Sequence, residues 1–163
     1  MPRMQPVDVG FVDRAAHVVR TDVDIDASID EVWEALADNT RWVDWFDCSR
    51  CTASPGIWTA AGDTRTIKLG PLTVDEIAVE IEAPNCWAMT LVRSNLFVWT
   101  RGLEMVELFD TSRDGETRTE IRWTGAFEFH PLARPMTKMI LGRAADTWGQ
   151  GYENLADHLR SRR

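Results

Sequence analysis

The stretch VDIDASIDEVWEALADNTRWVDWF, residues 23–46, contains the change of hydrophobic period that decides the fold class. Residues 17–25, which run into it, alternate between apolar and polar side chains, as a half-buried strand does. Beyond them, the apolar side chains recur at helical spacing instead. Ser28 and Glu31 form the S-x-x-E pattern of a capping box, in which each side chain accepts a hydrogen bond from the other residue's backbone N–H. A strand therefore gives way to a helix at residue 27 or 28.

A second short helix is predicted within the same stretch. The residues ADNT, 37–40, end the first helix and provide a new N-cap at Asn39 or Thr40. Trp42, Trp45 and Phe46 then occupy positions i, i+3 and i+4, which lie on one face of a helix. We expect these three aromatic side chains to close one end of the fold.

The chain from residue 48 onward changes to a series of strands. Alternating side chains predict strands at about residues 48–53, 63–69, 72–82, 86–94, 97–109 and 116–129. Turn sequences separate them, among them GP at 70–71, APN at 83–85 and SRDGE at 112–116. Connections this short join antiparallel neighbours. In the last strand, we expect one face to meet a core and the charged face to meet water.

One long amphipathic helix closes the chain. It is predicted from Pro135, which suits a first helical turn, to about Arg160. Its apolar stripe consists of Ile140, Leu141, Ala144, Trp148, Tyr152, Leu155 and Leu159. A helix of this size is roughly 38 Å long and can lie across a whole sheet. Strands that are grouped together, rather than alternating with helices, indicate an α+β fold.

The order of elements and three stretches of sequence resemble a known superfamily. Residues 23–46 are similar to its opening strand and helix pair, and AGDTRTIKL, 61–69, is similar to its third strand. VDEIAVEIEAPNCWAMTL, 74–91, resembles its glutamate-containing strand, proline turn and return strand. Over residues 16–160 the chain thus resembles the helix-grip (SRPBCC) superfamily of START, birch-pollen-allergen-like and polyketide cyclase/dehydrase proteins.

The resemblance implies an architecture and a cavity. The expected fold is a curved seven-stranded antiparallel sheet wrapped around the long C-terminal helix, with the two short helices between the first and second strands. A mostly apolar cavity between sheet and helix would hold a hydrophobic small molecule. The glutamate of the fourth strand, eight residues before its proline turn, corresponds to Glu76, which stands eight residues before Pro84.

Size and charge limit the other possible partners. A chain of 163 residues, 44% of them hydrophobic, suits one domain over residues 1–163, with residues 1–15 as a poorly defined N-terminal arm. The net charge of −8 argues against a nucleic-acid partner, because phosphates are neutralised by a basic surface. No apolar run has the length of a membrane span or of a signal peptide core. We therefore expect a cytoplasmic protein, either a monomer or a homodimer.

Aromatic and sulfur-containing side chains are the candidate lining of the cavity. Eight tryptophans and six methionines are many for this length, and such side chains suit flat, aromatic ligands. The expected ligand-binding residues are Arg65, Trp87, Met89, Leu91, Trp99, Trp123, Phe127, Ile140 and Trp148. The alternative interpretation is that these side chains only fill a core.

Glu76 and Arg101 are the candidate catalytic residues. Strict alternation along its strand would point Glu76 to solvent, and only a β-bulge would turn it inward. Arg101 shares a strand face with Trp99 and Leu103, so it is either a buried cation that orients a ligand or a bonded surface arginine. His130 is expected to make a hydrogen bond at the start of the last helix rather than to do acid–base chemistry.

The two thiols of CSRC, residues 48–51, do not fit a metal or redox site. A structural zinc needs four ligands, and Cys86 and the three histidines stand at no ligand-like spacing. A redox pair needs a helix N-terminus, whereas this pair enters a strand, in which Cys48 and Cys51 would face opposite sides. We predict no metal and no cofactor.

Two classes of function remain. The chain has no Ser-His-Asp order, glycine-rich phosphate loop or HExxH motif. It is therefore expected to bind a lipid, polyketide or aromatic metabolite, which requires only apolar burial and a polar anchor. The alternative is a polyketide cyclase, aromatase or dehydratase, in which the same cavity folds the substrate and one acid–base group moves protons. Whether the protein is an enzyme stays open at this point.

Overall fold

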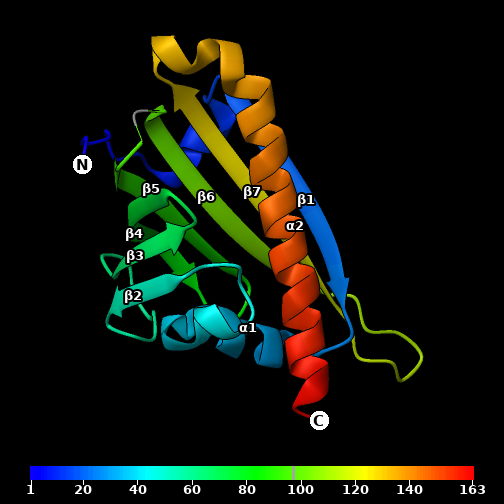
Figure 1. Ribbon diagram of the computed structural model, residues 1–163. Coiled ribbons are helices and arrows are strands. Elements are labelled where there is room, and N and C mark those ends of the chain that lie inside the picture. The colour runs from blue at the N-terminus through cyan, green and yellow to red at the C-terminus, as the bar shows by residue number, and fades with distance from the viewer. Residues whose placement is uncertain (97) are drawn as a thin grey trace.

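The computed structural model describes residues 1–96 and 98–163, whose strands form one seven-stranded antiparallel sheet (Figure 1). The strands are β1 (His17–Ile25), β2 (Arg50–Ser54), β3 (Thr64–Leu69), β4 (Leu72–Glu82), β5 (Cys86–Ser94), β6 (Trp99–Asp110) and β7 (Thr119–Phe129). Their order across the sheet is β1-β7-β6-β5-β4-β3-β2. Consecutive strands from β2 to β7 are therefore neighbours, and β1 pairs with β7. The predicted α+β fold is confirmed.

The observed strands differ from the predicted ones only at their ends. β2 begins at Arg50 rather than at residue 48, because the Cys48 N–H donates to the Phe46 carbonyl in a preceding turn. β7 begins at Thr119 rather than at residue 116, because Asp114 and Gly115 adopt positive φ in the turn before it. The predicted first residue of β6, at position 97, lies outside the described residues.

The first helix, α1 (Ile29–Ala37), begins at the predicted capping box. The Ser28 N–H donates to Glu31 Oε2 at 2.9 Å, and Ser28 Oγ accepts from the Glu31 N–H at 3.3 Å. The predicted second helix is the 3₁₀ helix η2 (Asn39–Asp44). Both helices lie between β1 and β2 in the chain and close the lower end of the sheet (Figure 1).

Three aromatic side chains, one in η2 and two directly after it, form a closed cluster at the lower end of the sheet. Trp42, Trp45 and Phe46 are all buried. The Trp42 and Trp45 ring centroids are 4.9 Å apart, and Phe46 lies 4.8 Å from Trp148 of the last helix. The expected closure of one end of the fold by these three residues is confirmed.

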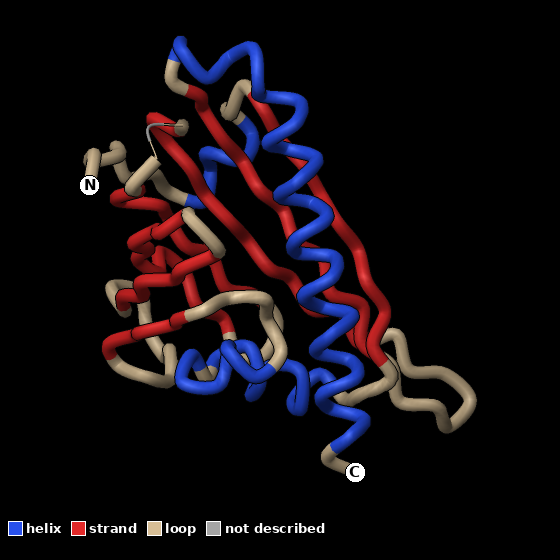
Figure 2. The backbone as a smooth tube through the Cα atoms, in the orientation of Figure 1, coloured by secondary structure: helices blue, strands red, loops and turns tan. Residues whose placement is uncertain are grey.

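The C-terminal helix, α2 (Thr137–Ser161), lies across β1 and β7 (Figures 1 and 2). It begins after Pro135, because residues Pro131–Met136 form a separate 3₁₀ helix, η3. The predicted stripe faces the sheet, with its C-terminal half buried and its N-terminal half partly buried. At Gly151 a Cβ atom would overlap the Phe46 ring, so glycine allows α2 to approach the segment just after η2 closely.

The N-terminal residues, expected to be a poorly defined arm, have defined contacts on the outer face of the sheet. The 3₁₀ helix η1 (Val9–Asp13) buries Phe11 against Leu103 of β6 and Ala126 of β7. The Met4 N–H donates to the Val92 carbonyl at 2.8 Å. Both faces of β6 and β7 are therefore covered here, and the expectation that the outer face of the last strand meets water is wrong over this part.

Candidate functional site

The predicted lining residues lie close together on the inner face of the sheet, which is the face toward α2. Trp87, Met89, Leu91, Trp123, Phe127 and Trp148 are buried in one cluster, and Trp99 and Ile140 are partly buried against it. The rings of Trp123 and Trp148 are stacked with centroids 5.5 Å apart, and those of Trp99 and Phe127 with centroids 5.9 Å apart. β5, β6, β7 and α2 thus contribute to one aromatic interior.

This interior is packed. The pockets among the described residues include one of about 10 Å³ that touches it, between Trp33, Leu36, Trp58 and Trp87. That volume is at the lower limit for a single water molecule.

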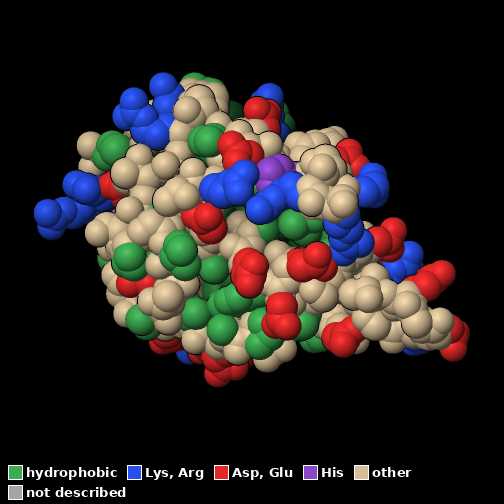
Figure 3. Space-filling view, turned by 90° about the horizontal axis from the view of Figure 1, so that it is seen from below, with side chains coloured by type: hydrophobic (Ala, Val, Ile, Leu, Met, Phe, Trp, Pro, Cys, Tyr) green, Lys and Arg blue, Asp and Glu red, His purple; other side chains and the backbone are tan. Residues whose placement is uncertain are grey.

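A second pocket, of about 320 Å³, lies on the surface of the molecule, between α1 and the C-terminal end of α2. Acidic and basic side chains surround this end of the molecule (Figure 3).

A buried ion pair lies on the inner face between β3 and β4. The side chains of Arg65 and Glu76 are only 1% and 4% exposed. The Arg65 Nε donates to Glu76 Oε2 at 2.7 Å, and Arg65 Nη2 lies 2.7 Å from the same oxygen. Burial raises the pKa of Glu76, while the charge and hydrogen bond of Arg65 lower it. The two side chains are direct cross-strand partners, which fixes the pair on the rigid sheet.

Each of the other two nitrogens of Arg65 also has a partner. Nη1 donates to Asn39 Oδ1 at 3.1 Å, and Nη2 contacts Met89 Sδ at 2.9 Å. The guanidinium lies over three indole rings, at 4.0 Å from Trp42, 4.9 Å from Trp58 and 5.5 Å from Trp87. Cation–π contact and a carboxylate partner together stabilise this charge in the absence of water.

Glu76 points inward because β4 is bulged. Its pairing with β5 shifts register between Asp75 and Glu76 and again between Ala78 and Glu80. The extra residue at Val79 reverses the alternation, so that Glu76 and Ala78 face the interior on one side of it. Counting back from Ile81 by twos therefore gives the wrong face. The bulge that an inward Glu76 requires is present.

Sequence reasoning missed a second buried carboxyl, Glu104 on β6. Its side chain is buried beside Met89 and Gly125, its cross-strand neighbours, and its Oε2 has no hydrogen-bond partner. Burial, and next the charge of Glu76, raise the pKa of Glu104 to about 8, although the charge of Arg65 lowers it. The indole N–H groups of Trp123 and Trp148 also lower it, because they lie near the carboxyl, without reaching the geometry of a full hydrogen bond to Oε2. Glu104 is therefore largely protonated at neutral pH in this environment.

A bulge also explains why Glu104 was missed. The pairing of β6 with β7 shifts register between Trp99 and Arg101. Trp99 faces the interior, but Arg101 and Leu103 face the other side, and Glu104 takes the inward direction. Strict alternation counted from Trp99 therefore places Arg101 inside and Glu104 outside, which is the reverse of the observed arrangement. The signal that could have identified Glu104 is its i+2 and i+4 neighbours, Val106 and Leu108, which are apolar and face the interior.

Other buried polar atoms of the inner face also have no hydrogen-bond partner. The Tyr152 hydroxyl of α2 and the Nε1 atoms of Trp87 and Trp123 are buried without a hydrogen bond. Burial, and then the charge of Glu104, raise the pKa of Tyr152, so its hydroxyl keeps its proton. Glu104, Tyr152 and Trp123 therefore form a polar group within the aromatic interior.

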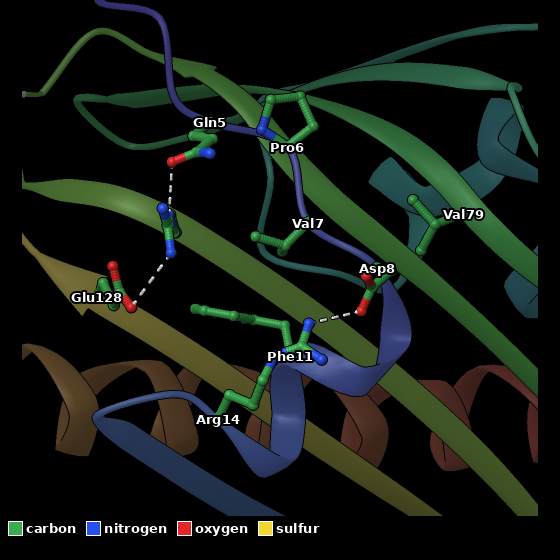
Figure 4. Close-up of a pocket in the computed structure, with 9 residues that line it drawn as sticks. Gln5, Pro6, Val7, Asp8, Phe11, Arg14, Val79 and Glu128 are labelled. Carbon is green, nitrogen blue, oxygen red and sulfur yellow. Dashed lines mark hydrogen bonds and ion pairs between the residues drawn. The ribbon is translucent and has the colours of Figure 1, made fainter.

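Arg101 does not belong to this group. It lies on the outer face, where its Nε donates to Gln5 Oε1 at 2.7 Å and its Nη1 lies 3.6 Å from Glu128 Oε1. Its side chain is 37% exposed and lines a pocket of about 570 Å³ between the N-terminal residues and the sheet. Figure 4 shows this pocket, with the Arg14–Asp8 ion pair at its other side. The interpretation of Arg101 as a bonded surface arginine holds, rather than that of a buried ligand anchor.

The remaining candidates have structural contacts. His130 Nδ1 accepts from the Leu132 N–H at 3.3 Å, which is the expected hydrogen bond at the start of the helical segment. Cys48 and Cys51 both lie near Arg65 rather than on opposite sides, because Cys48 is in the turn before β2. Burial raises the pKa of Cys51 and of Cys86 to about 12, which keeps both thiols protonated.

Within residues 1–96 and 98–163, no helix has the length and apolar character needed to cross a membrane. Nor do three or more of their His, Cys, Asp and Glu side chains gather in a way that could hold a metal ion.

The curved antiparallel sheet, the long C-terminal helix across it and the buried polar groups between them define a helix-grip protein (Figure 1). Residues 16–162 match the sequence pattern of the family described as polyketide cyclase / dehydrase and lipid transport, and the chain belongs to this family. No curated protein matches the sequence. The superfamily that the sequence resembles is thereby confirmed.

Solved structures with the same fold come from bacteria and plants. A START superfamily protein from Mycobacterium smegmatis has a TM-score of 0.69 at 14% identity, over 88% of this chain and 99% of that one. Ginseng major latex-like protein 151 from Panax ginseng has a TM-score of 0.65 at 11% identity, over 87% and 96%. Protein MLL2253 from Mesorhizobium loti has a TM-score of 0.67 at 19% identity, over 90% and 98%. These similarities concern the fold alone.

Proposed function

We propose that this protein binds a small hydrophobic molecule between the sheet and α2, with a polar group of the ligand directed at Glu104. The observation that carries the proposal is the set of unpartnered polar atoms on Glu104, Tyr152 and Trp123 inside an aromatic interior. An unsatisfied buried polar atom costs about 1–3 kcal/mol. A ligand that supplies hydrogen bonds to them would offset this cost.

The aromatic side chains support an apolar body for the ligand. Trp87, Trp123, Phe127 and Trp148 present flat surfaces with the ring areas that dominate binding energies in protein sites. Met89 is unbranched and polarizable, which lets it adapt its shape to a ligand. The description of the family as including lipid transport supports the same class of ligand.

The packed interior requires that binding separate some of these side chains. A ligand of ordinary size needs several hundred Å³, far more than the roughly 10 Å³ pocket at Trp58 and Trp87 provides. The stacked Trp123 and Trp148 rings, on β7 and α2, are contacts between the sheet and the helix that a ligand would replace. Binding is therefore expected to change the environment of both rings.

A fluorescence titration tests this proposal. N-phenyl-1-naphthylamine, a neutral polycyclic probe, should show saturable energy transfer from the tryptophans and should be displaced by long-chain alcohols. Arg101→Gln, which changes only the outer pocket, should bind the probe as the unchanged protein does. A signal that does not saturate, or one that Arg101→Gln abolishes, would contradict binding in the interior.

A second candidate function uses the same interior for catalysis. The pKa of Glu104, about 8, lies near neutral pH, as that of an effective general acid does. Glu104 could protonate a carbonyl oxygen of a polyketide-like chain, with Tyr152 beside it as a hydrogen-bond donor. Two residues were predicted from the sequence to be catalytic. Glu76 lies in this interior, where its charge raises the pKa of Glu104, whereas Arg101 lies on the outer face.

One comparison separates binding from catalysis. If the protein is a cyclase or dehydratase, Glu104→Gln should lose turnover of a poly-carbonyl substrate while retaining the neutral naphthyl probe. If it is a carrier, no turnover will be found for the unchanged protein, and Glu104→Gln will change only affinity.

A further inference from the structure

Among residues 1–96 and 98–163, the interior contains one buried guanidinium, that of Arg65, and each of its three nitrogens already has a partner. Arg65 is held by Glu76, Asn39 and Met89 and is enclosed by three indoles. A ligand carboxylate could reach Arg65 only by displacing Glu76, its carboxylate partner at 2.7 Å. The interior therefore has no free cation for an acidic ligand among the described residues.

Glu104 has a similar environment without the cation. Like Glu76, it is a buried carboxyl on the inner face, and tryptophan rings lie beside it. Whereas Glu76 is held by Arg65, Glu104 has an Oε2 atom with no hydrogen-bond partner. The stacked pair of Trp123 and Trp148 lies next to it, with the indole N–H groups near its carboxyl.

We propose that the ligand's polar group is a protonated amine that pairs with Glu104, so that the site selects amines with an aromatic or aliphatic body. The inference rests on the binding function proposed above and specifies its ligand class. An ammonium group donates the hydrogen bonds that Glu104 Oε2 lacks, and it balances the charge that Glu104 takes on when it ionises, which Arg65 cannot balance because it is paired with Glu76.

The other polar groups near Glu104 agree with a cationic ligand. The titratable and charged side chains that act on Glu104 are Glu76 from β4, Arg65 from β3 and Tyr152 from α2. Of these, Arg65 is paired with Glu76, and Tyr152 is neutral. A carboxylic acid would therefore meet two carboxyls and no free cation, whereas an alcohol would form only a neutral hydrogen bond.

Amine binding has a proton balance that can be measured. Burial raises the pKa of Glu104 to about 8, so the protein without ligand holds this proton at pH 7. When an ammonium ion binds, the carboxyl ionises to form the pair, and its proton passes to the buffer. An alcohol binds to the protonated carboxyl and releases none.

Calorimetry with four matched probes tests the inference. The probes are 2-naphthylmethylamine, 2-naphthylmethanol, 2-naphthoic acid and 2-methylnaphthalene, measured at pH 7 in phosphate and in Tris. We expect the amine to bind roughly tenfold or more tightly than the alcohol, because a charged hydrogen bond is stronger than a neutral one. The acid, which is an anion at pH 7, should bind less tightly than the amine because no free cation faces it. The difference in heat between buffers should correspond to release of about one proton for the amine.

Two variants of β6 assign the effect to Glu104. Glu104→Gln keeps the shape of the side chain and should lower amine affinity roughly tenfold, while alcohol affinity stays within about threefold. Glu107→Gln changes a carboxyl on the opposite face of the same strand and should leave both affinities unchanged. The proton count uses the unchanged protein and tests the inference even if Glu104→Gln does not fold.

The outcomes separate this inference from the binding function itself. If methylnaphthalene and the alcohol bind but the amine has no advantage and releases no proton, the amine preference is wrong and hydrophobic binding stands. If the amine preference persists in Glu104→Gln, the amine binds elsewhere and the inference is overturned. If none of the four probes binds, both proposals are wrong.

Discussion

Arg65 is the residue on which the polar interior depends most. A guanidinium stays charged at every pH that proteins tolerate, so its removal leaves the buried Glu76 carboxylate without its partner. We predict that Arg65→Met lowers the free energy of unfolding by about 3–5 kcal/mol. Urea denaturation followed by circular dichroism measures this loss.

Arg93 provides the matched control for Arg65. It pairs with Asp75 at 2.8 Å, but its side chain is 53% exposed. Because exposed ion pairs contribute about 0–1 kcal/mol, Arg93→Met should change stability by less than about 1 kcal/mol. Equal losses in Arg65→Met and Arg93→Met would show that burial of the Arg65 pair has no special energetic role.

Glu104 should make stability depend on pH in an unusual direction for a carboxyl. Its pKa is about 8 in the folded chain and has an ordinary value of 4.5, so the folded state holds the proton more tightly. The stabilisation is therefore fully present below about pH 4.5 and is lost as pH rises through 8.

Glu104→Gln should remove this loss. Between pH 6 and 8, the stability of the unchanged protein should fall relative to Glu104→Gln by roughly 2 kcal/mol, since one pKa unit corresponds to about 1.4 kcal/mol and Glu104 is half ionised at pH 8. Glu76 is present in both proteins, so its own titration largely cancels. Parallel stability curves over this range of pH would mean that Glu104 is not buried as described.

At the scale of single elements, bulges limit what alternation predicts. Glu76 could be proposed as an inward residue only because of the superfamily resemblance, since strict alternation points it outward. The bulge at Val79 has no distinctive sequence signal, as valine is common in regular strands. The irregularity after Trp99 likewise exchanged the faces of Arg101 and Glu104. Predicting these faces requires the pairing partner, which a single strand's sequence does not contain.

At two glycines of α2, substitution by alanine should change the stability of the protein in opposite directions. At Gly142 a Cβ atom would contact nothing, so Gly142→Ala should stabilise the protein by about 0.5–1 kcal/mol through helix propensity. At Gly151 a Cβ atom would overlap Phe46, so Gly151→Ala should destabilise the protein by about 1–3 kcal/mol. Thermal unfolding of the two variants measures both effects. Stabilisation by both substitutions would show that α2 and Phe46 are less closely packed than described.

At the scale of the whole molecule, the architecture was predictable because several independent signals agree. The capping box at Ser28, the alternation of β1 and the stripe of α2 all specify the same layered arrangement. The contacts of residues 1–15 were not predictable, since Phe11 is one aromatic residue in a short segment without periodicity. Its packing against Leu103 depends on a sheet face whose exposure the sequence left undetermined.

The packed interior is also a property of the whole molecule. The aromatic side chains come from η2, β5, β7 and α2, and together they fill the space that the fold encloses. Whether this space opens for a ligand depends on how α2 and the end closed by Trp42 and Phe46 respond. A ligand in the interior must disturb the indole rings there, whereas a ligand in the outer pocket leaves them unchanged.

Indole N–H resonances in a ¹H–¹⁵N spectrum test interior binding most directly. On titration with N-phenyl-1-naphthylamine, we predict saturable shifts of the Nε1–H signals of Trp87, Trp123 and Trp148, with only small changes at the backbone amides of Gln5 and Phe11. Shifts confined to the amides of Gln5, Phe11 and their neighbours in the outer pocket, with the three indole signals unchanged, would contradict binding between the sheet and α2.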